Sequence, residues 1–230
     1  MTIREIAGSI ANKALLPFGV ELNTLRGEKP LWESDEDFNA IYASIRLHTM
    51  MPVARLYVLY QFARYARSLS QTGHTAEVGA WRGGASYLMS KVTMARVHHV
   101  FDTFEGLPEA DEQRLAKGAF ADTSAELVEE YLAPLGNCKV HSGLFPATAS
   151  TLGDCQFSMV HIDTDLFSAT KVCLEYFWPR VIEGGVVVID DYRSRHVGVT
   201  EAVDDFATTA HLVVHCFSNG QAVIIKPPTP

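Results

Sequence analysis

The feature that most constrains the fold of this chain is a regular alternation of strand-like and helical segments. Five short apolar runs are each followed by a helical segment or a short connector: residues 75–79, 98–102, 138–142, 158–163 and 184–190. Such alternation predicts right-handed strand–helix–strand units and a parallel sheet. The last two runs, HLVVHCF and QAVIIK, are joined by a Ser-Asn-Gly tripeptide, which is a hairpin signal. We therefore expect an α/β fold of seven mostly parallel strands with a C-terminal antiparallel hairpin.

The composition favours one main domain that acts on a small molecule. With 230 residues, of which 47% are hydrophobic, the chain can build one sizeable core. We expect a helical N-terminal extension at residues 1–48, with lid or oligomer contacts, and a main domain at residues 49–230. The formal net charge is −8 and no cluster of lysine or arginine occurs, so a nucleic acid partner is disfavoured.

The cysteines and the hydropathy indicate a cytoplasmic protein. Cys138, Cys155, Cys173 and Cys216 show no CxxC spacing and are expected to be reduced thiols. No apolar run reaches the roughly 18–20 residues of a membrane span. The N-terminal stretch resembles a short amphipathic helix more than a signal peptide, so membrane contact is disfavoured.

Three aspartates end two of the apolar runs. Asp163 follows the run in MVHIDTD, and Asp190 and Asp191 follow the run in GGVVVIDD, with room for one helix and a return strand between them. Neighbouring parallel strands would bring these carboxylates together at one edge of the sheet, where ligands bind. Their mutual repulsion would be relieved by a divalent cation, and oxygen ligands favour Mg²⁺, Mn²⁺ or Ca²⁺ over zinc. The alternative is that each aspartate simply caps the helix that follows.

A glycine-rich turn follows the first run, in EVGAWRGGAS. Gly79, Gly83 and Gly84 permit a tight turn and a close approach of a ligand to the backbone. The spacing is E-x-G-x-x-x-G and not the dinucleotide signature GxGxxG. Glu77 at the strand end would suit a positive group, such as the amino group of a methionine moiety, better than a pyrophosphate. A purely structural turn remains the alternative.

Two polar residues end the next two runs. Asp102 could accept hydrogen bonds from both ribose hydroxyls of an adenosine cofactor, although a helix cap is the alternative. Ser142 is a weaker candidate for contact with adenine, and a turn serine is equally consistent with its position.

Taken together, these segments resemble a known family. The motifs EVGAWRGGAS, FDTFEGLPEAD, HIDTDLFSAT and EGGVVVIDDYRS, with TMMPVARLYVLYQFARY upstream, are similar to macrocin, mycinamicin and novobiocin O-methyltransferases of the TylF/MycF type. The similarity runs from about residue 45 to the end. The resemblance implies the Rossmann-like class I methyltransferase fold, with S-adenosyl-L-methionine as methyl donor, a Mg²⁺ (or Mn²⁺) site and a sugar hydroxyl of a natural product or glycan as acceptor. Similar enzymes form homodimers or larger assemblies.

The resemblance also implies roles for particular positions. The family's metal ligands fall on Asp163, Asp190 and Asp191, and Asp163 is also the implied general base and a cofactor neighbour. The implied cofactor contacts fall on Thr49, Met50, Glu77, Val78, Gly79, Ala80, Trp81, Asp102, Thr103, Phe104, Glu105, Gly106 and Ser142. The loop at residues 193–198 and the N-terminal extension depart from the family pattern, and both are expected to shape the acceptor pocket.

The same residues leave alternative functions open. A catechol-type O-methyltransferase would carry a lysine base three residues after Asp163, where this chain has Leu166, and the nearest downstream lysine is Lys171. That absence favours an aliphatic hydroxyl acceptor. A non-catalytic nucleoside-binding module, or a metal-dependent hydrolase or oxygenase, is also consistent with the scaffold.

Two further structural expectations follow from the sequence. His161 is expected to be a core residue. Residues 105–135 are expected to form a lid, with a surface helix pair as the alternative.

Overall fold

The structure is a computed structural model that describes residues 30–71, 73–95, 97–108, 116–194 and 197–228. The chain divides into two units, Met1–Asn39 and Ala40–Pro230. Most of the expected extension at residues 1–48 therefore lies outside the described residues.

The described part of the first unit contains a short 3₁₀ helix and the start of an α-helix. The 3₁₀ helix η2 spans Leu31–Ser34, and α2 spans Glu36–Ile45. The Asp35 carboxylate accepts a hydrogen bond from the Phe38 backbone N–H (2.9 Å), which satisfies one of the free donors at the start of α2.

The second unit contains the seven-stranded sheet that the sequence predicts, in the order β3-β2-β1-β4-β5-β7-β6. The strands are β1 His74–Val78, β2 His98–Asp102, β3 Cys138–Ser142, β4 Phe157–Ile162, β5 Val181–Ile189, β6 His215–Phe217 and β7 Gln221–Ile225. Strands β1 to β5 pair in parallel, whereas β7 pairs antiparallel with both β5 and β6. The expected hairpin is confirmed, and with it the α/β class.

One expected strand is shorter than its apolar run suggests. The run HLVVHCF begins at residue 211, but only His215–Phe217 forms a strand. His211 adopts a left-handed conformation (φ 54°), and the Leu212 N–H donates to the carbonyl of Ala207 in the preceding helix. The first residues of the run therefore terminate that helix, and they do not extend the sheet.

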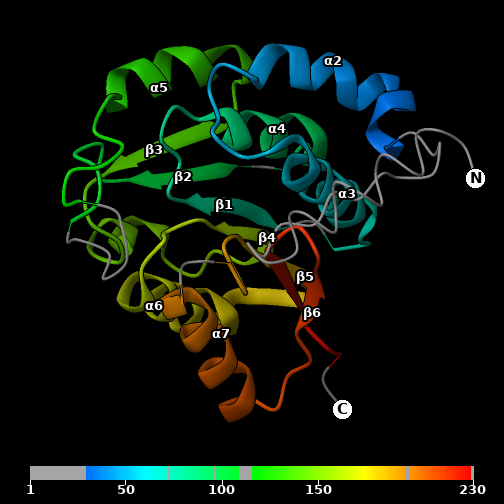
Figure 1. Cartoon of the computed structure of the whole chain (residues 1–230), viewed down its shortest axis with the longest axis vertical. Helices are drawn as coiled ribbons and strands as arrows, with labels where there is room; N and C mark the ends of the chain where they lie inside the picture. The colour runs from blue at the N-terminus through cyan, green and yellow to red at the C-terminus, as the bar shows by residue number, and fades with distance from the viewer. Residues whose placement is uncertain (1–29, 72, 96, 109–115, 195–196, 229–230) are drawn as a thin grey trace, which may run out of the picture. The chain divides into compact units, whose positions relative to one another are not determined.

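Helices cover both faces of the sheet (Figure 1). The α-helices of this unit, apart from the end of α2, are α3 Val53–Ser68, α4 Gly84–Thr93, α5 Ala125–Leu132, α6 Phe167–Phe177 and α7 Val197–Thr209. Short 3₁₀ helices occur at η3 Ala133–Leu135, η4 Ala147–Leu152 and η5 Trp178–Arg180. Helices α3 and α4 contact the strands on one face, and α6 and α7 pack side by side over the other. Among the described residues, no helix is long and apolar enough to cross a membrane.

The core under α6 is rich in aromatic side chains. Phe101, Phe157 and Phe177 are fully buried, and Phe177 lies edge-on to Phe157 with ring centroids 5.1 Å apart. The strand side chains alternate, so β2 presents Phe101 to α6 while its neighbours in sequence face the other layer. Edge-to-face packing of this kind adds about 0.5–1.5 kcal/mol per pair to the area that the rings bury.

The strand order determines where a ligand can bind. The chain runs outward from β1 to β2 and β3, and then returns across the sheet to β4 and β5. The order therefore reverses between β1 and β4. In open parallel sheets, a crevice forms outside the carboxyl ends of the strands at such a switch point.

Candidate active site

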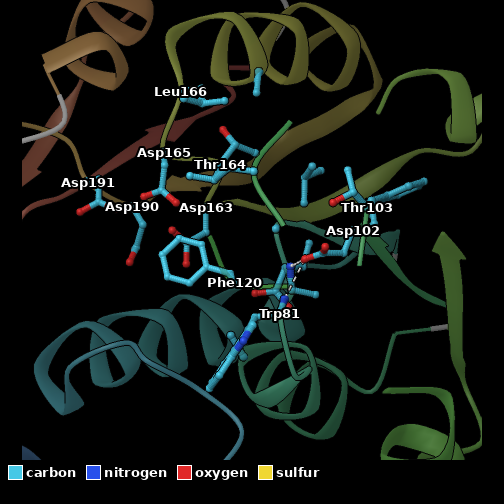
Figure 2. A pocket seen from close by; sticks show the side chains of 18 of the residues that line it. Trp81, Asp102, Thr103, Phe120, Asp163, Thr164, Asp165, Leu166, Asp190 and Asp191 are labelled. Atoms are coloured by element: carbon cyan, nitrogen blue, oxygen red, sulfur yellow. Dashed lines mark hydrogen bonds between the residues drawn. The ribbon is translucent and has the colours of Figure 1, made fainter. Parts of the chain in front are cut away.

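A cavity of about 480 Å³ lies at the carboxyl ends of β1, β2, β4 and β5 (Figure 2). This volume lies within the usual range for small-molecule sites. Most of the positions singled out from the sequence line it: Thr49, Met50, Glu77, Val78, Gly79, Ala80, Trp81, Asp102, Thr103, Gly106, Asp163, Asp190 and Asp191. Residues far apart in the chain thus meet in one cavity.

Three of the singled-out positions do not line the cavity. The Phe104 side chain is buried in a separate cluster with Val100, Val128 and Leu132. Glu105 and Ser142 are exposed, and the wall beside β3 is formed by the residues after Ser142, at positions 143–145.

The glycines of the first turn are required by close backbone contacts. A Cβ atom on Gly79 (φ 89°) would lie 1.9 Å from the carbonyl oxygen of Asp163, at the end of the neighbouring strand. A Cβ on Gly84 would lie 2.5 Å from the carbonyl oxygen of His48, which accepts a hydrogen bond from the Gly84 N–H (2.9 Å). These contacts hold the turn against both the end of β4 and the segment before α3.

Asp102 organises the loops around one end of the cavity. Its Oδ2 accepts hydrogen bonds from the backbone N–H groups of Ala80 and Trp81 (both 2.8 Å), and its Oδ1 accepts one from Phe104 (2.8 Å). Burial raises the pKa of Asp102, although these three donors act in the opposite direction. A carboxylate offers about four lone-pair sites, so Oδ1 retains capacity for a further donor, such as a ligand hydroxyl.

Trp81 links this end of the cavity to the segment before α5. Its indole N–H donates to the Asp122 carboxylate (2.7 Å), which also forms an ion pair with Arg82 (2.7 Å), and Thr123 donates to the Trp81 carbonyl (2.9 Å). Trp81 itself has a positive φ of 47°, which is uncommon for a bulky residue. Strained backbone of this kind typically marks functional sites.

The segment expected to act as a lid is only partly described. Residues 109–115 lie outside the described residues, while the flanking segments pair through hydrogen bonds between Leu107 and both Gly118 and Ala119 (each 2.9 Å). Phe120 follows and lines the cavity, and the remainder forms α5 and η3. The lid itself stays a prediction.

The other end of the cavity is acidic. Carboxylate oxygens of Asp163, Asp165 and Asp191 lie within 4.8 Å of one another, and Asp163 also lies within this distance of Asp190 and His161. Figure 2 shows these four aspartates gathered together, apart from Asp102. Burial raises the pKa of Asp163 well above its usual range, and the nearby charges of Asp190 and Asp165 raise it further.

Asp165 was not singled out from the sequence, although the D-x-D pattern HIDTD contains it. It has a positive φ of 60°, as does Asp191, and this backbone conformation belongs to residues at sharp turns. Both turns place carboxylates beside Asp163. The second aspartate of the D-x-D pattern is therefore the sequence signal that could have identified Asp165.

Arg55 is the most important residue that sequence reasoning missed. From α3, its Nη1 lies 3.2 Å from Asp190 Oδ2 and 2.9 Å from Asp191 Oδ1, and its Nε donates to the carbonyl of Asn219 (2.9 Å). Burial disfavours the charged guanidinium, but Asp190 and Asp191 outweigh it and raise the pKa of Arg55. Several arginines occur in α3, and nothing in the sequence distinguishes this one.

A buried polar network supports the acidic cluster from below. Ser86 donates to the Glu77 carboxylate, which lies 2.8 Å from His161 Nδ1. His161 Nε2 lies 3.5 Å from Asp190 Oδ1, an ion-pair distance too long for a good hydrogen bond, and Gln221 donates to the same oxygen (2.5 Å). Burial alone would disfavour protonation of His161, yet Asp190 and Glu77 raise its pKa to about 10. The group that faces Glu77 in the structure is therefore the His161 ring, and Glu77 also lines the cavity.

The donor chemistry of the cluster fits a hard divalent cation. The group formed by Asp163, Asp165 and Asp191 offers oxygen atoms only, as Mg²⁺ and Mn²⁺ prefer. The four aspartates outnumber the two cationic side chains, Arg55 and His161, so the ionised cluster keeps a negative charge. The raised pKa of Asp163 reflects first its burial and then the charges of Asp190 and Asp165. Asp190 is the carboxylate that Arg55, His161 and Gln221 already engage.

The sheet order, the antiparallel β7 and the cavity at the switch point define the Rossmann-like class I methyltransferase fold. The solved structure of the O-methyltransferase NovP superposes with a TM-score of 0.69 at 24% identity, covering 79% of this chain and 83% of that one. The structure of the calicheamicin methyltransferase CalS11 gives a TM-score of 0.68 at 18% identity, covering 98% and 93%. The expected fold class is confirmed.

The sequence comparisons identify the family. The model described as macrocin O-methyltransferase (TylF) matches residues 36–216, so the chain belongs to the TylF family. It is 32% identical over 163 residues to the 8-demethyl-8-(2,3-dimethoxy-alpha-L-rhamnosyl)-tetracenomycin-C 4'-O-methyltransferase of Streptomyces olivaceus, covering 63% of this chain and 62% of the relative. It is 27% identical over 180 residues to the mycinamicin III 3''-O-methyltransferase of Micromonospora griseorubida, covering 70% and 69%. The chain thus spans less than two thirds of the tetracenomycin relative.

Proposed function

We propose that this protein is a metal-dependent O-methyltransferase that moves a methyl group from S-adenosylmethionine to a hydroxyl of a sugar in a natural product or glycan. The observation that carries the proposal is the two-ended cavity. One end has a glycine turn organised by Asp102, and the other has a cluster of aspartates, in a chain of the TylF family. The relatives named above are O-methyltransferases of sugar-bearing natural products.

The end formed by β1 and β2 suits the methyl donor. The remaining lone pair on Asp102 Oδ1 would accept a ribose hydroxyl, and the turn at Gly79 would leave room for the ligand beside the backbone. Thr49 and Met50 also line the cavity, and Thr49 lies beside Gly84, so both would contact the donor there.

The aspartate cluster suits the metal and the acceptor. Asp163, Asp190 and Asp191 would hold Mg²⁺ or Mn²⁺, with Asp165 close enough to contribute. When bound, the donor supplies an electrophilic methyl group and the cation supplies a Lewis acid for the acceptor hydroxyl. Arg55 and His161 hold Asp190 and keep part of the negative charge balanced before any ligand enters.

Asp163 is the proposed general base. It lines the cavity beside Asp165 and Asp191, and a cation held there would lower the pKa of the acceptor hydroxyl, so a carboxylate could take its proton. Its carboxylate would take the proton that the acceptor hydroxyl loses as the new carbon–oxygen bond forms. The apolar wall, which includes Leu166 and Phe120, would exclude water from this proton transfer.

A catechol-type enzyme is the second candidate, and the cavity argues against it. Leu166 occupies the position of the expected lysine base and lines the cavity, while Lys171 is exposed on α6. Among the described residues that line the cavity, none is a lysine. A non-catalytic nucleoside-binding module is disfavoured because the aspartate cluster would then have no role.

Methyl transfer to a panel of glycosylated natural products, with labelled S-adenosylmethionine, tests the proposal. We expect transfer to a sugar hydroxyl that needs Mg²⁺ or Mn²⁺ and stops when the metal is chelated. Catechol substrates form the comparison arm. Transfer to catechols alone, or transfer that chelation leaves unchanged, would contradict the proposed acceptor or the proposed metal, respectively.

A further inference from the structure

A second group of metal-ligating side chains lies at the other end of the same strands. His74 is the first residue of β1, His99 is the second residue of β2, and Cys155 lies two residues before the start of β4. One potential ligand atom from each of these residues lies within 4.8 Å of the other two. Because β1 pairs in parallel with both β2 and β4, the group lies toward the amino ends of the strands, away from the cavity.

The two histidines are already close to the spacing of metal ligands. His74 Nδ1 and His99 Nε2 are 2.9 Å apart, and their rings stack at a centroid distance of 5.1 Å. Two nitrogens that bind zinc at about 2.0–2.1 Å in a tetrahedral site lie roughly 3.3 Å apart. Only a few tenths of an ångström would have to open between the rings to admit the ion.

His141 provides the outer partner that a metal-bound histidine typically needs. His99 Nδ1 lies 3.0 Å from His141 Nε2, so a proton on His99 Nδ1 can be donated to His141. This tautomer leaves the lone pair of His99 Nε2 directed at His74, as metal binding requires. The His141 ring is held by stacking on Phe101, with centroids 4.5 Å apart.

The chemistry of the group differs from that of the aspartate cluster. Two imidazoles and a thiolate favour zinc-like cations over Mg²⁺. His99 is buried, so its ring is held in place between the neighbouring histidines. His74 and Cys155 are half-buried, which leaves a path for a water molecule as fourth ligand.

We propose that His74, His99 and Cys155 form a zinc site that is separate from the cavity and links β1, β2 and the segment before β4. On binding, the Cys155 thiol loses its proton to solvent, and the proton that lies between His74 Nδ1 and His99 Nε2 moves through solvent to His74 Nε2. The thiolate and two neutral imidazoles then donate to the ion, so one proton is released per zinc. The site ties together three chain segments that are distant in sequence, and it stabilises the folded protein by mass action.

Cobalt substitution of the full chain, kept reduced with a phosphine, tests the site directly. We expect Co²⁺ to give the intense thiolate-to-metal absorption that a carboxylate site cannot give. The band should disappear in Cys155→Ser. It should be unchanged in Cys216→Ser, which alters an exposed cysteine outside the group, and in Asp163→Asn, which alters the aspartate cluster. Absence of the band in the wild-type protein, or its survival in Cys155→Ser, would overturn the proposal.

Zinc affinity, measured by competition with a chromophoric chelator, gives a second readout. We expect Cys155→Ser to weaken zinc at least 100-fold, and His141→Leu to weaken it about 10- to 100-fold through loss of the outer partner. Circular dichroism checks that each variant is folded. Zinc binding that is lost in Asp163→Asn and retained in Cys155→Ser would assign the ion to the aspartate cluster and overturn the proposal.

Discussion

Two carboxylates at the carboxyl edge of the sheet, Asp102 and Asp163, have opposite surroundings. Asp102 accepts three backbone hydrogen bonds and fixes the shape of the loops around it. Asp163 faces other carboxylates, and burial together with their charge raises its pKa. The same residue type therefore shapes the cavity at one end and concentrates charge at the other. The difference fits the proposed donor end and the proposed metal end of the cavity, and the first three predictions test parts of that contrast.

The largest effect is expected for Asp163→Asn. The amide cannot take up the acceptor proton, and loss of a general base typically lowers the rate about 10²- to 10⁴-fold. Binding of S-adenosylhomocysteine should be retained, because the Asp102 end is unchanged. Single-turnover rates and calorimetry measure the two quantities. Asp205→Asn, at an exposed position on α7, is the matched control and should keep the wild-type rate.

Gly79→Ala should damage both ends together. The added methyl group would lie 1.9 Å from the Asp163 carbonyl oxygen, so backbone must move, and a loss of about 3 kcal/mol or more in unfolding free energy is expected. Gly136→Ala is the control, because Gly136 also has a positive φ (74°) but has open space around it. The control should lose only about 1–2 kcal/mol from backbone strain. Equal losses in chemical denaturation would show that the close contact is unimportant.

Arg55→Leu tests the charge balance of the reactive end. Removal of the guanidinium leaves Asp190 and Asp191 without their partner, and we expect a loss of about 1–3 kcal/mol in unfolding free energy without metal. Added Mg²⁺ should then stabilise the variant more than the wild type, because the cation replaces the lost charge. Thermal unfolding with and without Mg²⁺ measures this, and Arg67→Leu, exposed on the same helix, should behave as wild type. If Mg²⁺ stabilises Arg55→Leu no more than the wild type, Arg55 does not balance the charge of the aspartates that would bind the metal.

The smallest effect concerns the pH dependence of stability at the amino ends of the strands. Burial, with the neighbours His141 and His74, lowers the pKa of His99 to about 3, so the folded state keeps it neutral while the unfolded state protonates near pH 6.5. Its contribution is therefore full above about pH 6.5, and between about pH 6.5 and pH 5.5 it falls by at most about 1.4 kcal/mol. Comparison with His99→Gln isolates this contribution from those of the carboxylates. If the unfolding free energies of the wild type and His99→Gln change with pH in the same way, His99 is not buried in its neutral form.

The fold could be predicted from the sequence because it depends on local patterns. Strand-like runs that alternate with helical segments, and a Ser-Asn-Gly turn near the end, determined the parallel sheet and the antiparallel hairpin. The boundary of β6 could not be predicted, because His211 and Leu212 are apolar or aromatic in pattern but are used to end α7. The pattern of apolar residues alone does not determine whether a residue between two elements joins the helix or the strand.

The site was predictable where residues end strands, and less so elsewhere. Asp102, Asp163 and Asp190 follow strands, and parallel pairing brings their ends to one edge. Arg55 reaches the cluster from a helix over 100 residues earlier in the chain, and this contact has no local signal. The engagement of Glu77 by Ser86 and His161 depends on side-chain packing across strands, so the sequence did not indicate these two partners, while the predicted contact of Glu77 with a cofactor stays a prediction.

The central claim is that one cavity holds a donor end and a separable metal end. The most direct measurement is calorimetric titration of the purified protein with S-adenosylhomocysteine, with and without Mg²⁺, on the wild type, Asp102→Ala and Asp163→Ala. We predict that Asp102→Ala weakens the nucleoside in both conditions, while Asp163→Ala keeps nucleoside binding and loses the response to Mg²⁺. No binding by the wild type at millimolar nucleoside, or equal weakening by both variants, would contradict the claim.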